Sequence, residues 1–323
     1  MNPSCFSDHM GVWAIEPAWF QQALRAVRSG VWTPEKPAHV RTGLEGFEVL
    51  PGRAARDLSR RDEPAAATTP GTSTPRSFAM LDGGIALVSL AGPLMKQRSK
   101  FGGSSTVDAR RQVREAMAAD DVKGILLAVD SPGGHVAGTA ELADDVASAK
   151  RRKPVHAFIE DLGASAAYWV ASQTKRISAN RMAQVGSIGT VLVVEDTSKA
   201  YSEAGVQVHV ISTGPFKGAG ADGAPVTPEH LAAWRETVVA FNEHFQGAVR
   251  KGRQLTENQL EKVSDGRVWV GQKALDLHLI DAVGTFEEAH GALVEEVKAR
   301  ASADAQRRAA ASLDVRQRLA QEE

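Results

Sequence analysis

The sequence predicts an α/β fold built around a mostly parallel sheet. From Ser77 onward, apolar strand candidates alternate with amphipathic helix candidates, which is the pattern of strands joined by crossover helices. The stretch Gly124 to Val129 is an uninterrupted apolar run, as expected of a strand that is covered on both faces.

Each element follows from a local pattern. The predicted strands are short apolar or alternating runs, at 85–90, 124–129, 155–159, 177–179, 190–194 and 206–211. The predicted helices carry apolar residues at helical spacing, at 107–119, 139–150, 166–172 and 197–204. A long helix is expected next, with Thr227 as its cap and Pro228 in its first turn, and Thr256 with Gln259 fits a capping box for a short helix.

The composition changes along the chain and suggests four segments. Residues 1–50 form an N-terminal extension in which only one short amphipathic helix is expected, near Pro17 to Ser29. Residues 51–76 are rich in Pro, Thr, Ala and Arg and predict a disordered linker. The main domain is expected at 77–285, and the tail 286–323 is expected to be a helix that frays into a charged end.

Charge and cysteine content exclude several classes of protein. The chain of 323 residues has a net charge of −1, which gives no general attraction to nucleic acid or anionic membrane. The single cysteine, Cys5, allows neither an internal disulfide nor a cysteine-rich metal site. We find no apolar stretch of about 20 residues and no signal-peptide pattern. We therefore expect a cytoplasmic protein without a membrane span, a nucleic-acid partner, a metal or a cofactor.

Ser165 is the first candidate for catalysis. It lies between the predicted strand 155–159, which is followed by an acidic turn, and an apolar helix, with small residues on both sides. A serine at the start of a helix lies where unpaired N–H groups favour developing negative charge. The alternative is a capping or packing serine, which is the commoner role for an isolated Gly-x-Ser.

Two further stretches carry glycine and serine directly beside predicted strands. Gly133 and Gly134 follow the strand 124–129, and backbone N–H groups at such glycines can hold an oxyanion. The alternative is an ordinary turn between a strand and a helix. Ser187, within Gly186-Ser187-Ile188-Gly189, could orient another catalytic group. The alternative interpretation is that this motif only forms a tight turn.

A serine nucleophile needs a base, and Lys217 is the candidate. His135, His156 and His209 lie in the same region, but no acid flanks them in a suggestive way. A lysine can replace histidine when burial lowers its pKa from ~10.4 toward ~7–8. Lys217 follows Pro215-Phe216 amid glycines, with no acid before Asp222, although a solvated loop lysine is the usual role of such a residue.

Taken together, these stretches resemble the S49 peptidase family, which includes signal peptide peptidase A and the phage capsid-assembly proteases. The resemblance runs from about Gly84 to Gly284 and departs from the family where alanines follow Ser165 in place of glycines. The matching motifs are Asp130–Gly134, Ala164–Trp169, Gly186–Gly189, Thr213–Lys217 and Gly266–Gly271 with Ala274, Leu279, Ile280 and Asp281.

The resemblance implies a ClpP/crotonase-like superhelix of strand–strand–helix units and a Ser–Lys dyad. Ser165 would be the nucleophile and Lys217 the general base, with Ser187 hydrogen-bonded to Lys217. Gly133, with Gly134 and Ala166, would supply the oxyanion donors. The alanines imply a preference for small residues at the cleavage site, and the family implies a ring-like homo-oligomer in which catalytic residues can cross between subunits.

The N-terminal segment Ile15–Trp19, the linker and the overall length look like the phage capsid proteases. Such an enzyme would cleave scaffold and portal proteins, and the linker around Thr68 to Thr74 is a candidate self-cleavage site. A signal-peptide-peptidase-like protease that acts on signal-peptide remnants is the alternative. Two further hypotheses remain: a crotonase-type acyl-CoA enzyme and a non-catalytic capsid or scaffold protein.

Overall fold

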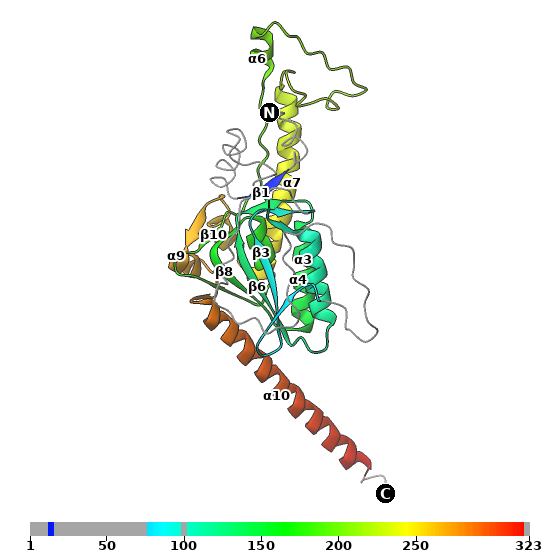
Figure 1. Ribbon diagram of the computed structural model, residues 1–323, viewed down its shortest axis with the longest axis vertical. Coiled ribbons are helices and arrows are strands. Elements are labelled where there is room, and N and C mark those ends of the chain that lie inside the picture. Colours follow the sequence, from blue (N-terminus) through cyan, green and yellow to red (C-terminus); the bar gives the residue numbers. More distant parts are fainter. Residues whose placement is uncertain (1–11, 16–75, 98–101, 320–323) are drawn as a thin grey trace, which may run out of the picture.

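The computed structural model describes residues 12–15, 76–97 and 102–319 (Figure 1). The helix predicted near 17–29, the candidate self-cleavage site at 68–74 and nearly all of the predicted linker lie outside the described residues. The described part confirms the mixed α/β fold with a largely parallel sheet.

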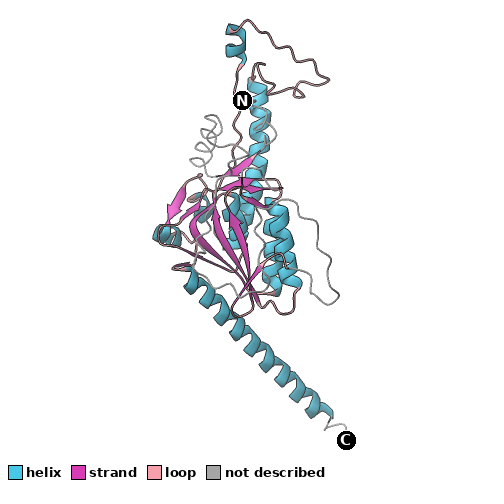
Figure 2. Ribbon diagram, in the orientation of Figure 1, coloured by secondary structure: helices cyan, strands magenta, loops and turns pink. Residues whose placement is uncertain are grey.

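The main sheet has eight strands and passes through the centre of the molecule (Figure 2). Its strand order is β11–β10–β8–β6–β3–β2, and β9 and β12 extend it beside β8. The neighbours β3, β6, β8 and β10 are parallel, whereas β2 and β11 pair antiparallel. The strands are β2 (Ala79–Leu81), β3 (Ile85–Ala91), β6 (Gly124–Ser131), β8 (Val155–Ala164), β9 (Arg176–Ala179), β10 (Gln184–Gly186), β11 (Val268–Val270) and β12 (Ala282–Val283).

A second, smaller sheet lies at the carboxyl ends of the central strands. Its order is β1 (Trp13–Ile15), β7 (Gly133–His135), β4 (Leu94–Met95) and β5 (Ser104–Ser105). After β3 the chain contributes β4 and β5 to this sheet before it enters a helix, and after β6 it contributes β7 in the same way. The fold therefore repeats a unit in which strands of both sheets precede a helix.

Helices cover the two faces of the main sheet unequally. The helices α3 (Thr106–Ala118), α4 (Thr139–Arg152) and α5 (Ala166–Ala171) pack with the sheet around the larger apolar core. The first turns of α10 (Phe286–Leu319) cover the other face, where Phe286 meets Phe158 edge to face at 5.6 Å. Beyond these turns α10 leaves the body of the protein (Figure 1).

The long helix α7 (Pro228–Arg253) packs against the body of the protein mainly through its C-terminal half. Thr227 caps it as predicted, in a capping box with His230. Near its C-terminal end, Phe245 stacks on Trp169 of α5, with ring centroids 4.9 Å apart. Its N-terminal half, together with α6 (Ser198–Glu203) and the intervening loop, extends away from the sheets (Figure 1). The remaining helices, α8 (Glu257–Glu261) and α9 (Gly271–Asp276), precede and follow β11.

Three sequence predictions about strands are wrong. Residues 190–194 and 206–211 form no strand, and Ile211 is 98% exposed. The alternation of apolar residues at 206–211 is real, but no neighbouring strand pairs with it in the described chain. The predicted acidic turn at 160–162 is instead part of β8, because Leu162 pairs with Gln184 of β10.

A partly buried ion pair ties the end of α7 to the turn that precedes β12. Arg253 donates to both carboxylate oxygens of Asp281, at 2.8 and 2.9 Å, and to the carbonyl oxygen of His278. Burial raises the pKa of Asp281, but the hydrogen bonds and charge of Arg253 outweigh it, so the pKa lies below its ordinary value. The pair therefore stabilises the protein at pH values above the ordinary carboxyl pKa of about 4. This stabilisation is lost as the pH falls through the pKa that Asp281 has in the folded protein.

We expect Asp281→Asn to destabilise the protein at pH 7 by about 2–3 kcal/mol. Loss of one partner of a buried pair typically costs ~3–5 kcal/mol, and we discount this because the Asp281 side chain is 34% exposed. Urea unfolding between pH 3 and pH 7 measures the effect. The wild type should lose stability toward pH 3 more steeply than Asp281→Asn, and parallel pH profiles would contradict this role of the pair.

Candidate active site

Ser165 has a strained backbone at the junction between β8 and α5. Its φ of 54° and ψ of −120° lie in a region that residues with side chains rarely adopt. Such a conformation costs about 1–3 kcal/mol and persists only where the surroundings enforce it. Here the Ser165 amide donates to the Gly186 carbonyl at 2.7 Å, and the Ser165 carbonyl accepts from the Trp169 amide at 2.8 Å. Strain of this kind is concentrated at functional sites.

The Ser165 hydroxyl is buried and makes no hydrogen bond among the described residues. The residue is 0% exposed, and its Oγ has no partner. Ser165 does not cap α5, because its side chain accepts no hydrogen bond from the first turn. The capping role is therefore excluded, and a buried hydroxyl without a partner costs about 1–3 kcal/mol.

This geometry predicts that Ser165→Ala raises stability by about 1 kcal/mol, because it removes an unsatisfied buried oxygen. Urea denaturation checks the prediction. The control is Ser131→Ala, because Ser131 Oγ donates to the Gly92 carbonyl at 2.6 Å and accepts from the Gly133 amide at 3.2 Å. We expect the control to lose stability. A Ser165→Ala protein less stable than the wild type would show that the hydroxyl has a structural partner.

Gly133 lies directly against the backbone on both sides of Ser165. Its φ is 95°, and a Cβ atom at this position would lie 2.8 Å from the Ala166 nitrogen and 2.9 Å from the Ala164 oxygen. It would also collide with the carbonyl oxygen of Ala14. A side chain at Gly134 would meet the backbone of Leu94. Close packing beside Ser165 therefore requires Gly133, and close packing against β4 requires Gly134.

The amide groups predicted as oxyanion donors differ in their present partners. The Gly133 amide donates to Ser131 Oγ at 3.2 Å, and Gly134 takes part in the ladder of the small sheet. The Ala166 amide makes no hydrogen bond among the described residues. Ala166 therefore offers a free donor directly after Ser165 in this conformation.

Ser187 lies next to Ser165 as well. It follows Gly186, whose carbonyl accepts from the Ser165 amide, and it is 3% exposed. Its φ is 51°, and its amide donates to the Arg267 carbonyl at 2.7 Å. The structure therefore brings together two buried serines that both have a positive φ.

The structure of a single copy does not bring Lys217 to Ser165. Lys217 is exposed, and the preceding residues contact the first turn of α7, where the rings of Phe216 and His230 are 6.0 Å apart. Trp169 contacts α7 at Phe245, 15 residues beyond His230. At 1.5 Å per residue this separation is about 22 Å along the helix.

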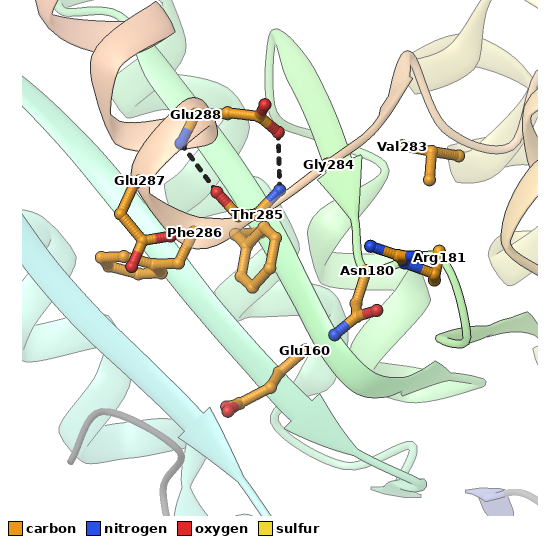
Figure 3. A pocket seen from close by; sticks show the side chains of 10 residues that line it. Glu160, Asn180, Arg181, Val283, Gly284, Thr285, Phe286, Glu287 and Glu288 are labelled. Carbon is orange, nitrogen blue, oxygen red and sulfur yellow. Dashed lines mark hydrogen bonds between the residues drawn. The ribbon is translucent and has the colours of Figure 1, made fainter. Parts of the chain in front are cut away.

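Other candidates lie away from Ser165. His156 is buried, and its Nε2 lies 2.9 Å from a carboxylate oxygen of Glu296 in α10, which is a structural pairing. A cavity of about 680 Å³ lies at the start of α10, where Glu160, Asn180 and Arg181 face Thr285 and its neighbours (Figure 3). Ser165, Gly133 and Ser187 do not line this cavity.

Sequence reasoning missed the strand β1, which lies beside the candidate site. Ala14 and Ile15 are 0% and 2% exposed and pair with β7. No local signal could have revealed this contact, because the two paired strands are separated by more than a hundred residues of chain. Ser131 was also missed, because only the structure shows that its hydroxyl holds the turn at Gly133.

Comparison with known proteins identifies relatives of this chain. It is 34% identical over 170 residues to an inferred protease of Methanocaldococcus jannaschii, covering 53% of this chain and 55% of that protein. It is 29% identical over 217 residues to Protease 4 of Salmonella typhi, covering 67% and 35%. It is 30% identical over 243 residues to capsid assembly protease C of Escherichia phage lambda, covering 72% and 53%. The chain thus spans about half of each relative's length or less.

Residues 147–300 match the model of peptidase family S49. The matched range includes Ser165, Ser187 and Lys217, and it leaves Gly133 and Gly134 outside. The resemblance inferred from the motifs is thereby confirmed: this chain carries a region of peptidase family S49.

Proposed function

We propose that this protein is a serine endopeptidase in which Ser165 is the nucleophile. The observation that carries the proposal is Ser165 itself, which lies between Gly186 and Gly133 with a strained backbone. Its buried Oγ has no hydrogen-bond partner among the residues that the structure describes. A structural serine needs neither a strained backbone nor a buried hydroxyl without a partner. A nucleophile, in contrast, needs a free hydroxyl that is held in a fixed direction. The repeated units, in which strands of the main and the smaller sheet precede a helix, support a ClpP/crotonase-like superhelix.

The proposed reaction is acyl transfer. Ser165 Oγ attacks the peptide carbonyl carbon while its proton passes to the uncharged amine of Lys217. The Ala166 amide stabilises the developing oxyanion, and the Gly133 amide joins it by exchanging its bond to Ser131 Oγ for one to the oxyanion, with Gly134 as a further donor. Lys217 then gives the proton to the leaving amine, and water hydrolyses the Ser165 ester with Lys217 again as base. In this scheme the Ser187 hydroxyl orients the Lys217 amine.

Lys217 is proposed to act on Ser165 of a neighbouring copy. The extension that carries Lys217 leaves the body of its own protein (Figure 1). Several of its large apolar residues are exposed. These residues are Val206, Val210, Ile211, Phe216, Leu231, Val239 and Phe241, each at least 37% exposed. Contiguous exposed apolar side chains mark interaction sites. A second copy is the fitting partner, because the site of each copy lacks the base that this extension provides.

We propose that the substrates are capsid scaffold or portal proteins, with small residues at the cleavage site. The match to the phage lambda protease supports this role because it covers more of this chain than the match to Protease 4 does. The described helices include none with the length and apolar character that a bilayer crossing requires. A signal-peptide-peptidase role is the second candidate, supported by the relatives of that class.

Co-expression with candidate capsid scaffold and portal proteins tests the proposed role. Wild-type protein and Ser165→Ala are each co-expressed with those proteins, and the products are identified by mass spectrometry. Cleaved scaffold or portal protein with the wild type alone is the expected result. Unchanged processing by Lys217→Ala would favour the hypothesis of a non-catalytic capsid or scaffold protein. Acyl-CoA turnover that survives Ser165→Ala would favour the hypothesis of a crotonase-type enzyme.

A further inference from the structure

The strand β1 occupies the edge of β7. Trp13, Ala14 and Ile15 lie opposite His135, Gly134 and Gly133 in an antiparallel register. The Val136 amide donates to the Val12 carbonyl at 3.2 Å. Hydrogen-bonded pairs alternate in antiparallel ladders, so Ala14 opposite Gly134 is the next such pair. The other edge of β7 is already paired with β4, so β1 fills its one remaining edge.

This edge lies at the candidate nucleophile. The Ala14 carbonyl oxygen lies against Gly133, on the side from which a Gly133 side chain would also meet the Ala166 nitrogen. Ala14 is 0% exposed and Ile15 is 2% exposed, and Ser165 beside them is 0% exposed. A peptide carbonyl of the protein itself therefore lies in the small space shared by Gly133 and the free Ala166 amide.

An open strand edge is also what an extended peptide needs for binding. Addition of a strand to a sheet edge uses the main-chain hydrogen bonds of any sequence, with side-chain pockets adding specificity. A substrate peptide that pairs with β7 would place a carbonyl near Ser165. It would need the same Gly134 and Val136 backbone groups that Val12 and Ala14 now engage.

We propose that Val12–Ile15 is a built-in pseudosubstrate that blocks the peptide-binding edge of β7 until it is displaced. This inference rests on the proposed peptidase function of Ser165. The strand is three residues long and pairs with β7 alone in the described chain. Its release breaks few hydrogen bonds, and an incoming peptide replaces them. The block is thus a competition between a tethered strand and a free one.

The test uses the full chain and two variants. Ala14→Pro removes the N–H that pairs with Gly134, and deletion of residues 12–15 removes the strand itself. Ala14→Gly keeps the N–H, adds no polar group at this fully buried position, and serves as the matched control. Hydrogen exchange of the 132–137 backbone reports release of β1, and the rate of fluorophosphonate labelling reports access to Ser165. A synthetic peptide of residues 9–18 is then added to each protein.

In both variants we expect faster hydrogen exchange at 132–137 than in the wild type. We also expect labelling about tenfold faster, because its rate is proportional to the fraction of molecules in which β1 is released from β7. Ala14→Gly should stay much closer to the wild type than Ala14→Pro, and the peptide should restore slow exchange and slow labelling in the variants. Labelling of the deletion variant at or below the wild-type rate overturns the proposal and makes β1 a structural support. If no protein labels at Ser165, the proposed nucleophile fails, and the peptide's effect on exchange alone decides whether β7 is a peptide-binding edge.

Discussion

Replacing Ser165 by alanine is expected to lower kcat/KM for peptide hydrolysis by about 10⁴–10⁶-fold, the loss typical of a nucleophile. The fold should survive, because the change removes one oxygen that has no hydrogen-bond partner in the described part of the chain. Steady-state rates on a fluorogenic peptide with alanine before the scissile bond measure the effect. Such a peptide suits the space beside Ala166 and Ala167, which are both fully buried.

Two buried serines serve as controls for this substitution. Ser187→Ala should lose about 10²-fold, because its hydroxyl is proposed to orient the base and not to react. Ser178→Ala, buried in β9, should keep the wild-type rate. A Ser165→Ala protein that retains a substantial part of the wild-type rate would remove Ser165 from the mechanism.

Replacing Lys217 by alanine is expected to lower kcat by about 10²–10⁴-fold, the usual contribution of a general base. Lys217→Arg should be equally impaired, because a guanidinium does not give up its proton at neutral pH. The control is Lys199→Ala in α6 of the same extension, where Lys199 is exposed and 3.9 Å from Glu203. Wild-type activity in Lys217→Arg would show that no proton passes through this residue.

Mixing the two inactive variants asks which copy supplies the base. If Lys217 acts on a neighbouring copy, Ser165→Ala and Lys217→Ala subunits together form sites that carry both intact residues. Activity should therefore return when the two proteins are mixed and allowed to exchange subunits. No return of activity, with subunit exchange verified by native mass spectrometry, would place both residues in one copy and require closure of the extension.

Local chemistry made the helices predictable. Thr227 with Pro228 and Thr256 with Gln259 form the expected caps, and the apolar spacing of α3 and α4 gave their positions within a few residues. Strands depend on partners that are distant in sequence. The alternation at 206–211 therefore suggested a strand where none exists, and the pairing of 162–164 with β10 could not be foreseen.

The candidate site was predictable in residue types but not in geometry. The motifs identified Ser165, Gly133 and Ser187, and the structure brings these three together. The motifs could not show that the Gly133 amide is engaged by Ser131, that β1 lies against Gly133, or that Lys217 is carried away on the α7 extension. Each of these features depends on contacts between segments far apart in the chain.

Mapping of a fluorophosphonate adduct tests the central claim most directly, because the reagent reports an activated serine hydroxyl without any assumption about substrate. The protein is labelled, digested and sequenced by tandem mass spectrometry. We predict one adduct, on Ser165, which is absent in Ser165→Ala and forms much more slowly in Lys217→Ala. An adduct on another serine, or undiminished labelling of Ser165→Ala, would contradict the account.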